Sequence, residues 1–370
     1  MLTPNQFYSY NINELPKGCQ YCVKGEKLVY FATGICPRKC YFCPISDEKY
    51  GKDVTFANER KVSLDETQSK EDIGGDPLAK LQRTLSFIRL MKEKYGKQFH
   101  IHLYTSLHLV TENTLQQLHD AGLDEIRFHL DFDSEQFWPK LSLAKKFSWD
   151  VGVELPIVPT KEKEMKKVLD FIQDKVNFLV LNELEVADNS QSKLLEMGFT
   201  PKDQASYAVK GSLEFGLELL QYAQQKNPLL KVHLCTAQLK DRVQLGNRFK
   251  REAQGVKKKF DHVDEEGLLT RGALYLPELV PGFSYRKKIE ECDKEPLIKK
   301  LKILAEEIKK EFQLKEEEIF IDEQKPRILL SAKKIAPLKK RFLKKGLIPA
   351  IVKEYPTADQ LEIEVELFEK

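Results

Sequence analysis

The 370-residue sequence lacks the roughly 20 consecutive apolar residues that a membrane-spanning helix needs. Residues 1–16 lack the apolar core of a secretion signal. A strong charge excess is also missing: 60 Lys and Arg face 57 Asp and Glu, so a net charge of +3 identifies no partner by itself. We find no internal repeat. These absences favour a cytoplasmic protein that binds no membrane. A length of 370 residues suits one large and one small domain.

The sequence also lacks the cysteine pattern of a disulfide-stabilised secreted protein. Its seven cysteines are odd in number, and five of them fall within residues 19–43, whereas disulfide frameworks are usually even and spread out. Reduced, metal-binding cysteines fit better. Cys36, Cys40 and Cys43 form a C-x3-C-x2-C pattern after residues 27–33, which we predict to be a buried strand. Three thiolates can bind three irons of a [4Fe–4S] cluster and leave the fourth iron open.

A second cysteine pair, Cys19 and Cys22, has the C-x2-C spacing of half a zinc or iron–sulfur site. With Cys40 and Cys43 the pair satisfies a zinc-ribbon spacing, which leaves Cys36 unexplained. The pair could instead join His233 and Cys235, which share a face of a predicted strand, in a Cys3His zinc site or an auxiliary cluster. The remaining interpretation is structural, with Cys235 a small buried residue and His233 on the surface.

The tetrapeptide Gly74-Gly75-Asp76-Pro77 follows the cysteines by about thirty residues. Its glycines allow the backbone to approach a ligand closely. Asp76 and Pro77 are also typical of an N-cap and a first helical residue. Both a cofactor-binding loop and an ordinary loop-to-helix junction are consistent with these residues.

From residue 78 to residue 236 the strand and helix patterns alternate, which predicts a parallel sheet with helical crossovers. The predicted helices are 78–95, 111–121, 134–147, 160–172 and 211–225, and the predicted strands are 99–105, 125–130, 151–158, 177–182 and 229–234. Catalytic and binding groups are expected where parallel strands end. The polar residues at these ends are Thr105, Ser106, His129, Asp131, Glu154, Asn182, Glu183 and Glu185. For His100 and His102, which lie within a predicted strand, we expect satisfied structural roles.

The cysteine spacing, with Tyr41 directly after the second cysteine, and the Gly-Gly-Asp-Pro sequence resemble the radical S-adenosylmethionine (radical SAM) superfamily. More narrowly, residues 18–22, 36–44, 57–60, 74–77 and 240–251 resemble an archaeal group related to the activating enzymes of pyruvate formate-lyase. The resemblance implies a partial (βα)6 TIM-like barrel over residues 27–236. It also implies an electron donor such as ferredoxin or flavodoxin.

The resemblance further implies that Cys36, Cys40 and Cys43 bind a [4Fe–4S] cluster that cleaves SAM reductively to a 5′-deoxyadenosyl radical. The residues that it places around SAM or the substrate are Tyr41 and Phe42 at the adenine, Gly74, Gly75, Asp76 and Pro77 at the methionyl end, and Thr105, Asp131 and Glu154 at strand ends. No catalytic acid or base can be named.

The expected organisation is a Cys-pair segment (1–26), the barrel (27–236), a basic loop-rich segment (237–292) and a small α/β domain (293–370) with the order α-β-β-α-β-β. Residues 240–259 carry eight Lys and Arg against two Asp and Glu. This segment either contacts the phosphates of an RNA or is a solvated face. Three functions therefore stay open: a radical SAM enzyme that modifies RNA, one that activates a glycyl-radical enzyme or modifies a peptide, and a zinc-stabilised nucleic-acid-binding protein without catalysis.

Overall fold

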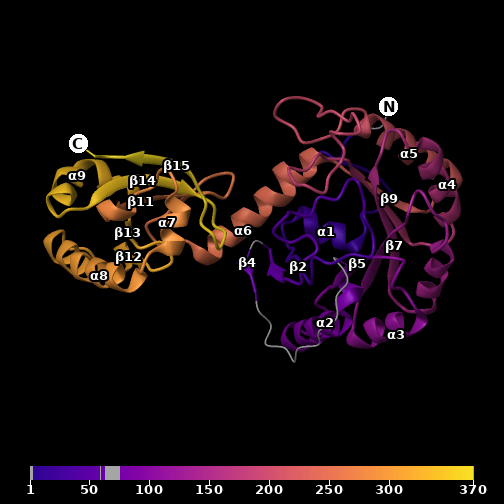
Figure 1. Ribbon diagram of the computed structural model, residues 1–370, viewed down its shortest axis with the longest axis horizontal. Helices are drawn as coiled ribbons and strands as arrows, with labels where there is room; N and C mark the ends of the chain where they lie inside the picture. Colours follow the sequence, from indigo (N-terminus) through magenta and orange to yellow (C-terminus); the bar gives the residue numbers. More distant parts are fainter. Residues whose placement is uncertain (1–2, 59, 63–75, 370) are drawn as a thin grey trace. The chain divides into compact units, whose positions relative to one another are not determined.

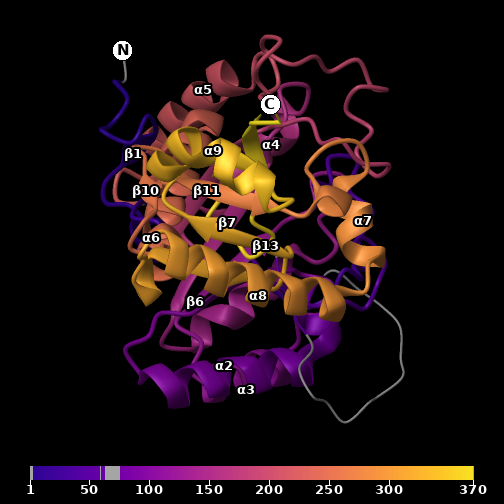
Figure 2. The same ribbon diagram turned by 90° about the vertical axis from the view of Figure 1, so that its left-hand side faces the viewer.

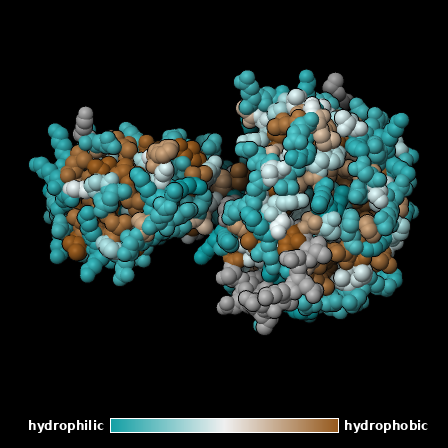
Figure 3. All heavy atoms as spheres, in the orientation of Figure 1, coloured by the Kyte–Doolittle hydropathy of each residue, from teal (hydrophilic) through white to brown (hydrophobic). Residues whose placement is uncertain are grey.

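The computed structural model describes residues 3–58, 60–62 and 76–369. The chain divides into two units, Met1–Gln244 and Leu245–Lys370, here called unit 1 and unit 2. Among the described residues, no helix is both long and apolar enough to cross a membrane. Figure 3 shows hydrophilic residues around the edges of both units and hydrophobic residues gathered in the middle of the face of unit 2.

Unit 1 is built on a six-stranded sheet in the order β1-β9-β8-β7-β6-β5. Its five parallel strands are β5 (His102–Ser106), β6 (Glu125–His129), β7 (Asp150–Ile157), β8 (Phe178–Glu183) and β9 (Lys231–Cys235), and β1 (Tyr10–Ile12) pairs antiparallel with β9. The connecting helices are η1 (Pro77–Lys80), α2 (Leu81–Tyr95), α3 (Glu112–Ala121), η2 (Trp138–Lys146), α4 (Glu162–Ile172) and α5 (Ser212–Lys226). The predicted parallel sheet with helical crossovers is confirmed.

The two faces of this sheet differ because side chains alternate along each strand. Figure 1 shows α2, α3, α4 and α5 along one face, with the short helix α1 (Lys17–Val23) on the other side. Ile126 and Phe128 belong to the large apolar core and are fully buried. Truncating such a buried phenylalanine to alanine typically costs about 3–5 kcal/mol. The opposite face carries Glu125 and Arg127 and is the polar face of the sheet.

The expected first strand of a barrel, residues 27–33, does not join this sheet. Only Tyr30–Phe31 (β2) is a strand, and it pairs antiparallel with β3 (Phe56–Ala57), which in turn pairs with β4 (Arg60–Lys61). Strand β5 therefore ends the parallel sheet, which is not closed among the described residues. The prediction of a strand within a (βα)6 barrel was wrong here because an apolar run indicates burial but no pairing partner. Tyr30 instead stacks on Phe87 of α2, with 3.8 Å between ring centroids.

Unit 2 contains an antiparallel sheet in the order β12-β13-β11-β14-β15, with β10 paired to β11. The strands are β10 (His262–Val263), β11 (Leu269–Tyr275), β12 (Ile319–Asp322), β13 (Arg327–Leu330), β14 (Ile348–Glu354) and β15 (Glu362–Leu367), and the helices are α6 (Gly246–Val256), α7 (Tyr285–Glu291), α8 (Lys294–Glu311) and α9 (Ile335–Lys344). Helices α8 and α9 cover one face of the sheet (Figure 2), and α7 packs on the other. The predicted α-β-β-α-β-β order is confirmed.

The segment predicted to be loop-rich, residues 237–292, contains β11, the central strand of the second sheet. Two residues hid this strand. Arg271 is a buried charge in the middle of the strand. Gly272 is required because a Cβ there would lie 2.7 Å from Ile335 of α9. Both residue types are typical of loops in sequence patterns, so the prediction failed where tertiary packing overrides propensity.

Candidate active site

The three cysteines of the C-x3-C-x2-C pattern lie in an irregular loop after β2. All three thiols are free; Cys36 is exposed, and Cys40 and Cys43 are half-buried. The loss of hydration that surrounding atoms cause raises the pKa of each thiol, that of Cys36 to about 11 even though this residue is exposed. Backbone N–H groups of Arg38 and Ile45 partly offset this rise at Cys36 and Cys43 by donating hydrogen bonds to the sulfurs. Three soft donors with hydrogen-bonded sulfurs in one loop suit an iron–sulfur cluster.

The cysteine loop is anchored at the carboxyl end of β6. The Nη1 atom of Arg38 donates a 3.0 Å hydrogen bond to the carbonyl oxygen of His129, the last residue of β6. The Nη2 atom of Arg38 lies 3.6 Å from the carboxylate of Asp131. The ring of Phe42 packs 5.7 Å from the His129 ring. The loop thus lies at the sheet edge where parallel α/β folds place their active sites.

Asp76 joins the cysteine loop to the end of β5. Its carboxylate accepts hydrogen bonds from Leu78 N (3.1 Å), Thr105 Oγ1 (2.6 Å) and both the N–H and the hydroxyl of Ser106 (each 2.8 Å). Its own N–H donates to the carbonyl of Ile35 at 2.7 Å. The predicted N-cap, with Pro77 as the first helical residue, is confirmed.

The Asp76 carboxylate and the Thr105 hydroxyl, both assigned to cofactor contact from the sequence, thus already bind each other. This arrangement makes them supports of the loop. Gly74 and Gly75 lie outside the described residues.

A cavity of about 430 Å³ lies against the polar face of the sheet. Phe42 and Pro44 reach it from the cysteine loop, and Glu154 and Asn182 reach it from β7 and β8. The other predicted residues that line it are Cys19, Cys22, His129, Glu183, Glu185, His233 and Cys235. The structure therefore brings together predicted residues of β6, β7, β8 and β9, of α1 and of the flank of the cysteine loop, although Glu154 lies in the middle of β7 and not at its end.

Arg127 is the central charge of this cavity. Its guanidinium binds Glu125 through Nε (2.6 Å) and Nη2 (2.5 Å), and Glu154 through Nη1 (2.7 Å). Glu154 also accepts a 2.9 Å hydrogen bond from Asn182 Nδ2. Burial by itself would raise the pKa of Glu125. The neighbouring His100 and Arg127 outweigh this effect and lower the pKa to about 2. The guanidinium of Arg127 thus lies between two carboxylates, of which Glu154 lines the cavity.

The ring of Phe178 lies beneath this arginine, with its centroid 5.2 Å from the guanidinium carbon. Gly152 on β7 makes room for that ring, because a Cβ at this position would lie 2.1 Å from it. The guanidinium is held from below by an aromatic face and from the sides by carboxylates, which fixes its orientation.

The second cysteine pair lies on α1, with Cys19 and Cys22 both buried against the polar face. Cys19 Sγ is 3.6 Å from Arg127 Nη2, and burial raises the pKa of Cys19 to about 12. His233 Nε2 lies 3.3 Å from Ser9 Oγ, while its Nδ1 is buried without a hydrogen bond among the described residues. Burial also raises the pKa of the Cys235 thiol.

Neither predicted zinc set forms a ready mononuclear site. Tetrahedral zinc with 2.3 Å bonds to sulfur places the sulfurs about 3.8 Å apart. In the described part of the chain, the single group of three or more donor atoms within 4.8 Å of one another is His100, His102 and Glu125. The zinc-ribbon set (Cys19, Cys22, Cys40, Cys43) and the Cys3His set (Cys19, Cys22, His233, Cys235) do not reach this proximity.

Reasoning from strand ends missed the residues within the strands. Tyr104, Glu125 and Arg127 were not singled out, although polar residues alternate with apolar ones along both β5 and β6. That alternation is the signal that one sheet face is polar.

The two carboxylates that we expected to meet a substrate already have partners in the chain. Glu183 accepts a 2.7 Å hydrogen bond from Ala237 N, and Glu185 binds Lys240 at 2.8 Å. Lys240 lies in the π-helical turn Leu239–Leu245, a type of turn that is frequent at functional sites.

The basic segments are partly neutralised by ion pairs. Lys259 pairs with Glu317. On α9, Arg341 and Lys345 both pair with Glu311 of α8. These pairs reduce the positive field that an RNA would meet.

No family model matches the chain. A protein of Methanocaldococcus jannaschii, provisionally named a glycyl-radical enzyme activating enzyme, is 35% identical over 378 aligned positions. The alignment covers 97% of this chain and 94% of the relative.

Proposed function

The chain belongs to the radical SAM superfamily, and from this premise we propose that it removes a hydrogen atom from a glycine residue of a partner protein. The observation that carries the proposal is the position of the three free cysteines beside a cavity whose wall holds hydrogen-bonding groups of both charges. Membership of the superfamily implies an enzyme that uses a [4Fe–4S] cluster and SAM, with a reductant such as flavodoxin or ferredoxin.

Cys36, Cys40 and Cys43 would hold the cluster, which together with SAM supplies a 5′-deoxyadenosyl radical. Asp76 holds the cysteine loop against β5 by its hydrogen bonds to Thr105 and Ser106. The loop geometry is therefore fixed before any ligand binds, which is the general contribution of a protein to cofactor chemistry.

The cavity wall fits a peptide better than a polyanion. The donors of Arg127 are occupied by Glu125, Glu154, Tyr104 and Cys19, so this residue orients Glu154. The second amide N–H of Asn182 can donate to a peptide carbonyl, and Glu154 can accept from a peptide N–H. Three carboxylates, of Glu154, Glu183 and Glu185, line the cavity with three cations, of Lys27, Arg127 and Lys240, so the wall offers phosphates no excess of positive charge. Together with the ion-paired basic segments, these charges favour a glycyl-bearing peptide over RNA as substrate.

Isotope transfer into 5′-deoxyadenosine tests the proposal. The full chain is reconstituted anaerobically with iron and sulfide and reduced in the presence of SAM. Soluble protein from cells grown on 2,2-dideuteroglycine, or RNA deuterated in its ribose and bases, is then added. We expect deuterium in 5′-deoxyadenosine only with the labelled protein, together with a glycyl-radical EPR signal. Deuterium transfer from RNA alone would contradict the peptide substrate.

A further inference from the structure

Three potential metal ligands converge away from the cysteine loop, at the amino ends of β5 and β6. His102 is the first residue of β5, His100 lies two residues before it, and Glu125 is the first residue of β6. One donor atom from each lies within 4.8 Å of the other two. The cysteine loop is anchored at His129, at the other end of β6. A five-residue strand spans about 13 Å between its end residues, so the two places are distinct.

His100 has a ring nitrogen without a hydrogen bond. We expected both histidines to have satisfied structural roles. Instead, Nε2 of His100 is buried and makes no hydrogen bond to any described residue; it lies 3.5 Å from Glu125 Oε2 in poor alignment. An unpaired buried imidazole nitrogen carries a desolvation cost of about 1–3 kcal/mol. A cation bound between this nitrogen and the carboxylate would remove that cost.

The other two side chains are already oriented by neighbouring groups. Glu125 Oε1 binds Arg127, and Oε2 accepts a 3.0 Å hydrogen bond from Gly18 N while keeping a lone pair. His102 Nε2 lies 3.4 Å from the Tyr104 hydroxyl. Metal-binding histidines commonly hydrogen-bond through their second ring nitrogen in this way, which fixes the ring and its tautomer.

Gly18 of α1 keeps the space beside these donors open. A Cβ at this position would lie 2.8 Å from His102 Nδ1 and 2.9 Å from Glu125 Oε1. The φ angle of Gly18 is not in the left-handed region, so glycine is required here for lack of space and not for its backbone conformation.

We propose that His100, His102 and Glu125 bind one divalent transition-metal ion of the zinc, cobalt or iron(II) type. Two imidazole nitrogens and one carboxylate oxygen are the donors that such ions prefer. Three protein ligands leave a fourth position open. Both histidines also line a second cavity, of about 620 Å³, whose other walls include Leu28, Val29 and Phe87. The open position faces this apolar cavity and takes water or a small oxygen ligand.

Cobalt(II) binding to the full chain tests this site without any measurement of radical chemistry. The chain is treated with chelator and titrated anaerobically with Co²⁺. We use the Cys36→Ala variant in parallel, so that ligation by the predicted cluster site is disrupted. The ligand-field band of Co²⁺ reports binding, and a thiolate charge-transfer band would reveal cysteine ligands. We expect one tight Co²⁺ per chain with a ligand-field band and without the thiolate band.

The variants His100→Gln and His102→Gln are expected to lower the Co²⁺ affinity at least about tenfold. His100→Gln is the decisive change because the one polar contact that it removes among the described residues is the 3.5 Å contact to Glu125, so the fold is expected to persist, as circular dichroism would check. His119→Gln, at a partly exposed histidine on α3, is the matched control and should bind as the unaltered chain does.

Equal Co²⁺ affinity in His100→Gln and the unaltered chain would overturn the site, as would a thiolate band at the first equivalent. The result is independent of the proposed radical function. If the cysteine loop has been misassigned, the chain would fail to cleave SAM but would still bind Co²⁺ at His100, His102 and Glu125.

Discussion

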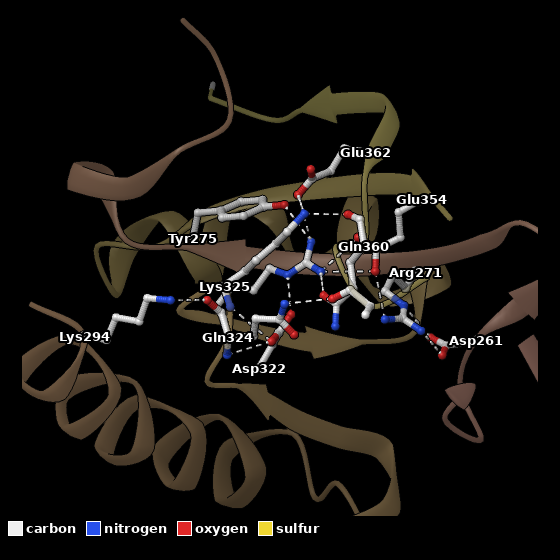
Figure 4. A network of polar contacts seen from close by, with 12 residues as sticks. Asp261, Arg271, Tyr275, Lys294, Asp322, Gln324, Lys325, Glu354, Gln360 and Glu362 are labelled. Atoms are coloured by element: carbon white, nitrogen blue, oxygen red, sulfur yellow. Dashed lines mark hydrogen bonds and ion pairs between the residues drawn. The ribbon is translucent and has the colours of Figure 1, made fainter. Parts of the chain in front are cut away.

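Each unit contains a buried arginine paired with carboxylates, and the arginine of unit 1 also borders a cavity. In unit 2, fully buried Arg327 donates to Asp322 (3.0 Å), to Tyr275 (3.2 Å), and to Glu354 and Gln360 (each 2.9 Å). Figure 4 shows these partners around the guanidinium, joined by dashed contacts. In unit 1, Arg127 is similarly paired but borders a cavity.

Both networks lie near buried groups without hydrogen bonds among the described residues. These are His100 Nε2 and His233 Nδ1 around Glu125 and Arg127, and Glu362 Oε1 and the Tyr285 hydroxyl around Arg327. Buried polar groups are usually satisfied, so each exception calls for an explanation. In the Arg327 network, Arg271 adds a second cation on Glu354 at 2.9 Å. A buried network stabilises the fold of its unit, and one that borders a cavity can in addition meet a ligand.

The largest expected effect is on the stability that the Arg327 network gives to unit 2. Arg327→Leu leaves Asp322 buried without its arginine partner. Glu354 loses one of its two arginine partners and keeps Arg271. Removing one partner of a buried ion pair costs about 3–5 kcal/mol. We expect unit 2 to lose that much stability, measured by hydrogen exchange of β11 and β13.

Unit 1 provides the internal control for this variant. Both tryptophans of the chain, Trp138 and Trp149, lie in unit 1, so their fluorescence during urea unfolding reports unit 1 alone. Unchanged hydrogen exchange in β11 and β13 would mean that the Arg327 network does not hold unit 2 together.

At the cavity wall of unit 1 we expect a smaller loss of stability than Arg327→Leu causes in unit 2, but a larger loss of activity. Asn182→Ala removes the hydrogen bond to Glu154. Such a bond contributes about 1–2 kcal/mol, and we expect 5′-deoxyadenosine formation to fall about tenfold if Glu154 then reorients. Asn177→Ala is the matched control, because Asn177 bonds Val151 N at 2.9 Å at the other end of the same sheet. If both variants retain full activity, the wall of the cavity does not position a ligand.

The smallest effect is expected at a partly exposed ion pair. Burial raises the pKa of Asp53, but hydrogen bonds from Arg83, Lys80 and Thr33 outweigh it and lower the pKa below 3.8. The carboxylate therefore stabilises the fold above pH 3.8, and this contribution is lost as the pH falls through the lowered pKa. Solvent screening limits it to under about 1 kcal/mol.

Asp53→Asn should therefore lower the stability of unit 1 slightly at pH 7 and not at pH 2, measured by tryptophan fluorescence in urea. An equal loss of stability at both pH values would contradict the assignment to charge.

The sequence predicted the parallel sheet, its helices and the position of the Asp76 cap, because these depend on local periodicity and capping. It did not predict that residues 27–33 would leave the parallel sheet, since strand pairing is a tertiary choice. It also missed β11, in which Arg271 and Gly272 are explained only by contacts from distant segments.

The same limit applies to the site. The spacing singled out the three cysteines as candidate ligands, and Asn182 and Glu154 were predicted as strand-end residues, although Glu154 lies in the middle of β7. Arg127 and His100 were not recognised, because their roles depend on which neighbours the fold brings to them.

The central claim, that Cys36, Cys40 and Cys43 support radical SAM chemistry, is tested most directly by quantifying 5′-deoxyadenosine from the anaerobically reconstituted, reduced full chain. Cys292→Ala serves as the control, since this half-buried thiol belongs to the core of unit 2. We predict that Cys36→Ala lowers product to background while Cys292→Ala matches the unaltered chain. Product formation by Cys36→Ala at the rate of the unaltered chain, or none by any of the three, would contradict the account.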